Sequence, residues 1–153
     1  MTTLVFGHKA PDTDSTGSPL IWEWFINHTG GDAKAALLGT PNTEAAFVAT
    51  RWGFDLPQII ADVADGQDCV IVDTNNPAEL PENVESAVVH SIIDHHKMAG
   101  LTTAEPLEID MRPLCSAGSI LYARMKTAGV TPTPAIAGLM LSCILSDSLE
   151  FRS

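Results

Sequence analysis

Short apolar runs alternate along the chain with segments of helical periodicity. Five runs have the length and composition of strands, at residues 2–7, 33–38, 69–72, 88–93 and 107–109. The run at 69–72 is apolar throughout, as in a parallel strand covered on both faces, whereas 107–109 is weak and is expected at an edge. Helical spacing falls between the runs, at 15–29, 43–52, 116–128 and 134–145. This alternation predicts an α/β fold: a Rossmann-like, parallel five-stranded sheet with helices on both faces.

Length and hydropathy place the chain among ordinary globular domains. Its 153 residues suffice for one domain with its own core, and a hydrophobic content of 45% excludes a disordered chain. No apolar run approaches the roughly 20 residues that cross a membrane, and residues 1–6 lack the features of a signal peptide. We therefore expect a cytoplasmic protein without a membrane partner.

Cysteine usage and net charge narrow the function further. Cys69, Cys115 and Cys143 are far apart, so buried thiols in a reducing compartment are expected rather than disulfides or a thiolate zinc site. A net charge of −11 argues against nucleic acid as a partner. The acidity fits either a soluble surface or carboxylates clustered around cations, and only their positions can decide between the two.

Polar groups that can bind metal follow four of the predicted elements. They are His8, Asp12 and Asp14 after the first strand, Asp73 after the third, Asp94-His95-His96 after the fourth, and Asp147 after the last helix. Each has an ordinary explanation on its own, since Asp14 can cap a helix, Asp73 can sit in a turn and a single histidine is usually structural. Their convergence at the edge of the sheet where ligands bind favours a metal or catalytic site.

The types of ligand indicate the metal. Histidine with several aspartates and no thiolate suits manganese, cobalt or magnesium. The candidate groups are too many for one ion, which takes about six ligands including water, and suit two ions that share a bridging carboxylate. Paired ions about 3.5–4 Å apart are the arrangement that clamps phosphoryl transfer, and a hydroxide between them would be a strong nucleophile.

Two motifs carry a family resemblance. Gly-His-x-x-Pro-Asp-x-Asp-Ser at 7–15, with Asp-His-His at 94–96, resembles the DHH phosphoesterase superfamily. Leu38-Gly39 with Asn42-x-Glu44-x-x-Phe47, and the block from 137–148 with Phe151, are similar to its family II branch, the manganese-dependent inorganic pyrophosphatases. The resemblance covers essentially the whole chain, so that residues 1–153 correspond to the N-terminal DHH metal-binding domain only.

The resemblance implies roles for individual residues. Six side chains would bind two Mn²⁺ ions, with Co²⁺ or Mg²⁺ as possible substitutes: His8 and Asp12 at the first, Asp14, His95 and Asp147 at the second, and Asp73 bridging both. His96 would face the substrate phosphate and, with Asp73, act in catalysis, while Asp94 would orient its neighbours. The chain departs from many members at Thr74, where they have histidine, so any role of that histidine is lost or taken by another group.

The implied reaction is hydrolysis of pyrophosphate to two phosphates. Members of the family carry a second domain, of comparable size, that supplies Lys and Arg to the substrate. This chain ends at Ser153, about where the linker is expected, and holds only 8 Lys and Arg. We therefore expect a metal-binding half that lacks the C-terminal substrate-binding domain and is poorly active alone.

The same resemblance implies a homodimer formed through this domain. A weak strand at 107–109 would leave an open sheet edge, which other chains readily pair with. Two other functions stay open: a different DHH phosphoesterase, such as an exopolyphosphatase or phosphodiesterase, or a non-catalytic metal-binding or dimerisation module.

Overall fold

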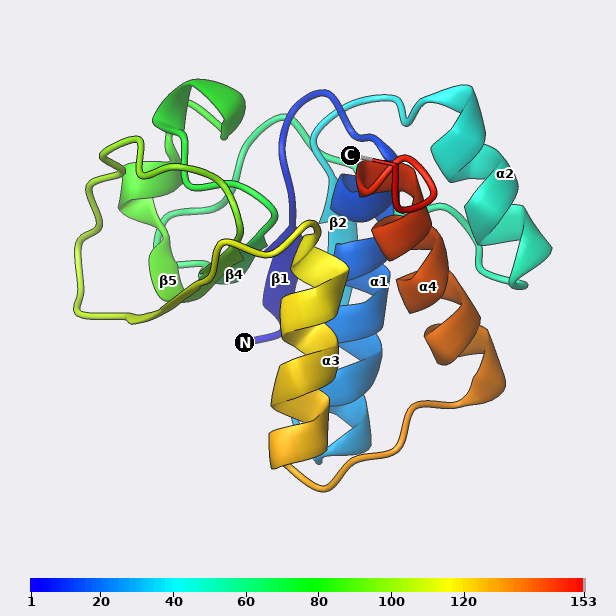
Figure 1. Ribbon diagram of the computed structural model, residues 1–153. Coiled ribbons are helices and arrows are strands. Elements are labelled where there is room, and N and C mark those ends of the chain that lie inside the picture. Colours follow the sequence, from blue (N-terminus) through cyan, green and yellow to red (C-terminus); the bar gives the residue numbers. More distant parts are fainter. Residues whose placement is uncertain (153) are drawn as a thin grey trace.

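The computed structural model describes residues 1–152 and contains six strands and four α-helices within them (Figure 1). The strands are β1 (Thr3–Phe6), β2 (Ala33–Leu37), β3 (Gln58–Ile59), β4 (Asp68–Val72), β5 (Val88–Asp94) and β6 (Glu108–Met111). The α-helices are α1 (Thr13–His28), α2 (Thr43–Arg51), α3 (Ala117–Thr127) and α4 (Pro134–Asp147), and two short 3₁₀ helices are η1 (Pro77–Glu79) and η2 (Val84–Ser86).

The strands form one parallel sheet in the order β3-β2-β1-β4-β5-β6. The chain moves outward from β1 to β3, returns to the centre at β4 and then moves outward the other way. The sheet therefore has a topological switch point between β1 and β4, where open α/β sheets bind their ligands beyond the carboxyl ends of the strands. The predicted parallel α/β fold is confirmed, but the predicted number of five strands is wrong. The missed strand, β3, has two exposed residues and therefore no apolar pattern to read.

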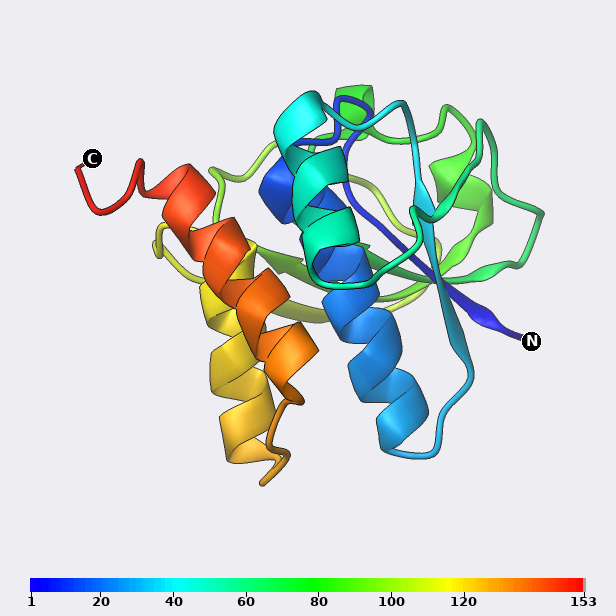
Figure 2. The ribbon, with the colours of Figure 1, turned by 90° about the vertical axis from the view of Figure 1, so that its right-hand side faces the viewer.

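The two faces of the sheet are covered differently. On one face Val5, Val70 and Ile93 pack against α1, α3 and α4, which lie side by side in Figures 1 and 2. The other face, with Phe6 and Ile71, is covered by η1, η2 and loops. Right-handed crossovers place α1 and α2 on one face and η1 and η2 on the other, because connections leading toward β3 and toward β6 must pass over opposite faces. Helices α3 and α4 follow the last strand and pack beside α1. The expectation of helices on both faces therefore needs correction: the four α-helices lie on one side, and 3₁₀ helices with loops cover the other.

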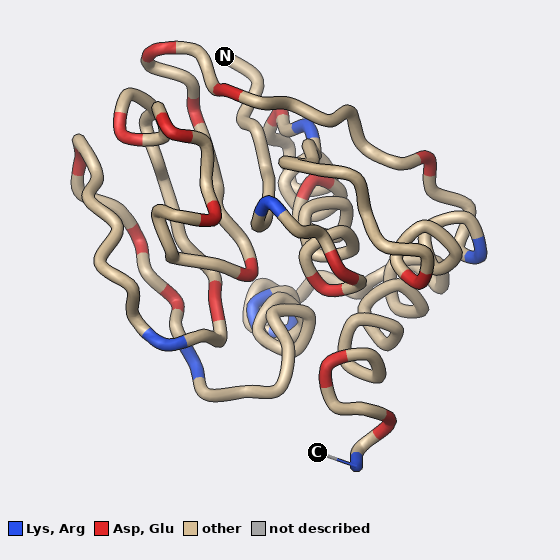
Figure 3. The backbone as a smooth tube through the Cα atoms, turned by 90° about the horizontal axis from the view of Figure 1, so that it is seen from above, with Lys and Arg blue, Asp and Glu red and all other residues tan. Residues whose placement is uncertain are grey.

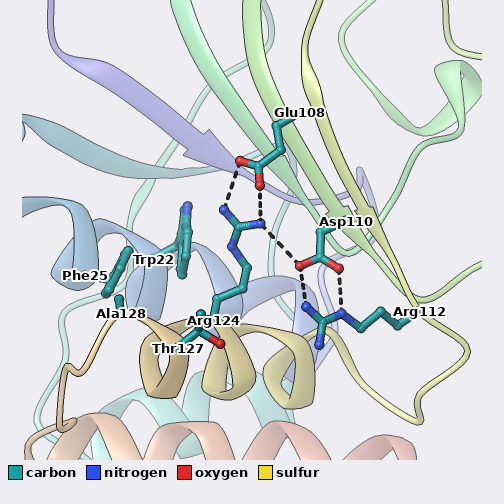
Figure 4. A pocket seen from close by; sticks show the side chains of 8 residues that line it. All are labelled: Trp22, Phe25, Glu108, Asp110, Arg112, Arg124, Thr127 and Ala128. Carbon is teal, nitrogen blue, oxygen red and sulfur yellow. Dashed lines mark hydrogen bonds and ion pairs between the residues drawn. The ribbon is translucent and has the colours of Figure 1, made fainter.

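Ion pairs attach the edge strand β6 to α3 (Figure 4). The Arg124 guanidinium donates to Glu108 at 2.8 Å and to Asp110 at 3.2 Å, and it lies over the Trp22 ring, 5.2 Å from the centroid. Arg112 donates to Asp110 at 2.7 Å. Charged pairing thus replaces apolar packing at this edge, which explains why the strand gave a weak apolar signal.

Two sequence expectations concern the whole chain. No helix among residues 1–152 is long and apolar enough to cross a bilayer. The three cysteines are free; Cys69 and Cys143 are buried as expected, whereas Cys115 is exposed.

Candidate metal centre

The loop between β1 and α1 is fixed by short-range hydrogen bonds. Asp12 caps α1, because its Oδ1 accepts from the Ser15 amide at 2.9 Å. The Ser15 hydroxyl accepts from the His8 amide at 2.8 Å. Gly7 is required next to this bond, since a Cβ there would lie 2.0 Å from Ser15 Oγ. The result brings His8 Nε2 to 3.7 Å from Asp12 Oδ2.

Asp14 lies in the first turn of α1 and is completely buried. Its Oδ1 accepts from Ser18 Oγ at 2.9 Å and from the Gly118 amide at 3.1 Å, and its Oδ2 accepts from the Ala117 amide at 2.6 Å. These two amides belong to the first turn of α3, whose dipole favours a negative charge. The helix therefore holds the carboxylate in place at the centre of the site.

Asp73 follows β4 and is 1% exposed. Its φ of 61° is in the left-handed region, a strained conformation for a residue other than glycine that occurs preferentially at functional sites. Asp73 Oδ1 lies 3.0 Å from His95 Nε2, and Oδ2 lies 3.4 Å from His8 Nε2. Among the described residues Oδ2 is buried without a hydrogen-bond partner. One carboxylate is thus shared between two histidines that follow different strands, His8 after β1 and His95 after β5.

His95 and Asp147 complete the second half of the cluster. His95 Nδ1 lies 3.1 Å from the Leu114 carbonyl oxygen, which can only accept, so Nδ1 carries the proton of that contact and Nε2 is the atom that can bind a metal. Nε2 lies 3.7 Å from Asp14 Oδ2 and 3.6 Å from Asp147 Oδ2, at the end of α4. Figure 3, which looks onto this edge of the sheet, shows acidic positions gathered there and few basic ones.

Asp94 holds the turn that carries both histidines. Its buried Oδ1 accepts from the backbone amides of His95 and His96 at 2.7 and 3.1 Å, and it lies 2.8 Å from His96 Nδ1. The His96 side chain is 51% exposed and lies at the mouth of the site. Asp94 thus contacts both residues that follow it, and its predicted role in orienting metal ligands stays a prediction.

The charges of the cluster are coupled. Burial disfavours the charged forms of His8 and His95, but the neighbouring carboxylates outweigh it and raise the pKa of His8 to about 10 and that of His95 to about 9. Burial, then repulsion from Asp73 and Asp147, raises the pKa of Asp14 well above its usual range. Burial also raises the pKa of Asp147. The metal-free cluster therefore retains protons that a divalent cation would displace.

The residues present fit divalent ions. Three overlapping groups have ligand atoms within 4.8 Å of one another: His8, Asp12 and Asp73; Asp14, Asp73, His95 and Asp147; and Asp73, His95 and His96. Two ligands of one ion, each about 2.1 Å away and at a right angle, lie roughly 3 Å apart, close to the separations in the cluster. The ligand atoms are oxygen and nitrogen only, and Asp73 Oδ2, which accepts no hydrogen bond from the described residues, is available to a cation. The structure thus brings all six predicted ligands together, and their individual roles stay predictions.

Three polar residues support the cluster without having been predicted to. Glu44 Oε1 accepts from Thr13 Oγ1 and from Ser146 Oγ, both at 2.5 Å, so it ties the start of α1 to the end of α4. The sequence singled out Glu44 only as part of a motif. Thr74 is buried, and its hydroxyl donates to Glu79 at 2.6 Å. Asn75 donates to Asp94. The only signal for Asn75 in the sequence is its position directly after Asp73-Thr74.

Fold and site together define the class of protein. The sequence model of a protein family, described as the DHH family, N-terminal domain, matches residues 2–144 of this chain. This chain belongs to the DHH family.

Similar proteins narrow the class further. A Staphylococcus epidermidis protein named probable manganese-dependent inorganic pyrophosphatase is 38% identical over 152 residues, and a Staphylococcus aureus protein of the same name is 40% identical. Each comparison covers 99% of this chain and 49% of the relative. The crystal structure of a Methanococcus jannaschii putative family II inorganic pyrophosphatase superposes with a TM-score of 0.89 at 32% identity, over 99% of this chain and 50% of that one. An exopolyphosphatase-related protein from Bacteroides fragilis shares the fold, with a TM-score of 0.77 at 15% identity. The chain thus spans about half the length of these relatives.

Proposed function

We propose that this chain is the metal-binding half of a manganese-dependent inorganic pyrophosphatase, a hydrolase that splits pyrophosphate into two phosphates. The observation that carries the proposal is the shared carboxylate of Asp73, whose two oxygens face His8 and His95 at 3.4 and 3.0 Å. A bridging carboxylate between two ligand groups is what a two-metal phosphoryl-transfer site requires. The names of the relatives add the metal and the substrate.

The proposed ligands form two groups around Asp73. His8 and Asp12 would hold one ion, and Asp14, His95 and Asp147 the other. Divalent ions held by these residues would supply charge that neutralises phosphate oxygens and would lower the pKa of a bound water. Ser15 Oγ accepts from the His8 amide, the Leu114 carbonyl oxygen accepts from His95 Nδ1, and the Ala117 amide donates to Asp14. These hydrogen bonds fix the ligand residues before any ion arrives, which reduces the cost of assembling the site.

His96 is proposed to face the substrate. Because Asp94 Oδ1 only accepts, His96 Nδ1 carries the proton of that contact and Nε2 is left for other partners. The half-exposed ring would lie beside a bound phosphate, and in its doubly protonated form it would donate from Nε2 to a phosphate oxygen or pass that oxygen a proton.

Charge limits what this half can do alone. The chain has 8 Lys and Arg against 19 Asp and Glu, and pyrophosphate is a polyanion. Transfer of a phosphoryl group depends mainly on positioning and on neutralising the charge of the transition state. We propose that another domain supplies these cationic groups and that this chain turns over pyrophosphate slowly by itself.

The test is a phosphate-release assay on the chain joined to the C-terminal half of the Staphylococcus aureus relative. With saturating manganese, pyrophosphate should be hydrolysed in preference to short polyphosphate, cyclic dinucleotides and short oligonucleotides. The Asp73→Asn variant of the same fusion controls for contaminating pyrophosphatase. A preference for polyphosphate or for a nucleotide substrate would overturn the proposal in favour of another DHH phosphoesterase.

We also propose self-association through this domain. Strand β6 pairs with β5 on one side, and no other described strand pairs with its outer edge. Ile109 on this strand is 51% exposed, so a second copy could extend the sheet and cover it. A cytoplasmic location, where three free cysteines stay reduced, completes the proposal.

A further inference from the structure

Asn75 lies between the two loops that carry the shared aspartate and the histidines. The residue is 4% exposed, and its side-chain amide makes three hydrogen bonds. Nδ2 donates to Asp94 Oδ2 at 2.5 Å and to the Lys97 carbonyl oxygen at 3.0 Å, and Oδ1 accepts from the Ala99 amide at 2.6 Å. Both hydrogens of the amide are used, and the partners lie at the last residue of β5 and in the segment directly after it.

Only an amide of this length fits these partners. Asp94 Oδ2 and the Lys97 carbonyl oxygen accept from Asn75, while the Ala99 amide can only donate. An aspartate in place of Asn75 would keep the bond from Ala99 and lose both donations. It would also set a second carboxylate against Asp94, where like charges repel in a buried site.

The contact with Asp94 leads directly to the histidines. Asn75 donates to Asp94 Oδ2, and Asp94 Oδ1 receives the His95 amide, the His96 amide and His96 Nδ1. The orientation of that carboxylate therefore decides where the turn lies and how the His96 ring is held. Asn75 also lies in the same loop as Asp73, two residues after it.

We infer that Asn75 is a positioning residue of the metal centre: its amide locks the Asp94 carboxylate and thereby sets His95 and His96 relative to Asp73. The inference rests on the proposed function, because it assigns Asn75 to the same two-metal site. Outer groups that orient metal ligands typically change metal affinity by about 10–100-fold when they are replaced. The effect should fall on the ion held by His95, since His8 and Asp12 are fixed by Ser15 instead.

The experiment titrates the metal-free chain with Mn²⁺ by calorimetry, and with Co²⁺ by visible absorption. Asn75→Asp should lower the affinity for the ion of the His95 group by about 10–100-fold, whether that ion is the more tightly or the less tightly bound of the two. It should also alter the Co²⁺ spectrum of that site. The affinity for the ion at His8 and Asp12 should change by less than about twofold, because that site lies outside the hydrogen-bond network of Asn75. To assign the two ions, Asp12→Asn removes a ligand from the first site only.

A matched control separates positioning from general stability. Asn83 makes the same kind of contact near the start of β5, where Nδ2 donates to the Val63 carbonyl at 2.7 Å and Oδ1 accepts from the Val63 amide at 3.3 Å. Asn83→Asp removes a donor in the same way and should lower the thermal unfolding temperature. It should leave both the affinities and the Co²⁺ spectrum unchanged.

A swap of donor and acceptor tests the route through Asp94. Asp94→Asn combined with Asn75→Asp restores a hydrogen bond between the two side chains and keeps the net charge. The double variant should lose less affinity than the sum of the two single losses. Strictly additive losses would overturn the inference.

The remaining outcomes separate the two proposals. Absence of Mn²⁺ binding by the unaltered chain would overturn the proposed function. Two ions bound by the unaltered chain, with the same affinities and spectrum in Asn75→Asp, would overturn the Asn75 inference alone. Equal loss in Asn75→Asp and Asn83→Asp would also overturn it, because the effect would then be one of stability.

Discussion

Replacing Asp73 by asparagine should abolish tight binding of both metal ions while leaving the fold intact. Asparagine has the same shape and tolerates the φ of 61° at this position, so the change removes one charge and one oxygen with little strain. Asp73→Ala should cause the same loss of metal with added backbone strain of about 1–2 kcal/mol.

The magnitude follows from the ligand groups. Without Asp73 the first group falls to His8 and Asp12, and the second to Asp14, His95 and Asp147. A unit charge about 4 Å from another, at an effective dielectric constant of about 20, contributes about 4 kcal/mol. The expected loss is therefore roughly a thousandfold in affinity at each site.

Calorimetric titration with Mn²⁺ measures this loss, with circular dichroism to establish folding. Asp62→Asn, at an exposed position, is the charge-matched control and should bind as the unaltered chain does. In the metal-free variant the pKa values of His8 and His95 should also fall, because Asp73 helps to raise both. If either ion bound Asp73→Asn with unchanged affinity, the assignment of Asp73 as a shared ligand would be refuted.

Further predictions concern pH, catalysis, assembly and packing. Because the pKa of His8 is raised to about 10 and that of His95 to about 9, both imidazoles are protonated at neutral pH without metal; Mn²⁺ affinity should therefore rise from pH 7 toward 9, with proton release detected by calorimetry in different buffers. These histidines stabilise the metal-free fold fully below about pH 6.5 and lose that contribution as pH rises through 9 and 10, so thermal unfolding with chelator should show falling stability there; constant stability across this range would contradict the raised pKa values. The chain alone should release phosphate from pyrophosphate at least about 10³ times more slowly than the fused protein, and equal rates would show that it holds a complete site. Sedimentation at tens of micromolar should show a dimer, and a monomer alone would contradict the proposed pairing of β6. Gly138→Ala should destabilise the chain by about 1–3 kcal/mol in urea unfolding, because a Cβ would lie 2.4 Å from the Trp52 ring; a stabilised variant would contradict this packing.

The parallel sheet and the place of the site could be predicted because each depends on a local pattern. The apolar run at 69–72 corresponds to β4, and the polar residues directly after β1, β4 and β5 are brought to one edge by the topology alone. Asp147 could be placed there because it follows the last predicted helix. The match of motifs at 7–15 and 94–96 then gave these positions a common chemistry.

What was missed depends on contacts between distant segments. Strand β3 exists because Ile59 pairs with Leu37 of β2, not because of its own composition. Asn75 reads as an ordinary turn residue until the fold places it against Asp94. The cover of the second face by 3₁₀ helices and loops likewise follows from short connections, whose lengths do not show which face they cross.

The ligands of the proposed centre extend from His8 to Asp147, over nearly the whole length of the chain. An unfolded chain cannot hold these groups together, so an ion bound by the native state stabilises the entire domain. At a free metal concentration 100 times the dissociation constant, the gain is about 2.7 kcal/mol per site. Proteases act on opened chains, and their access to this one would fall as the supply of manganese rises. The abundance of the protein would then follow the metal through degradation, independently of how fast any substrate is consumed.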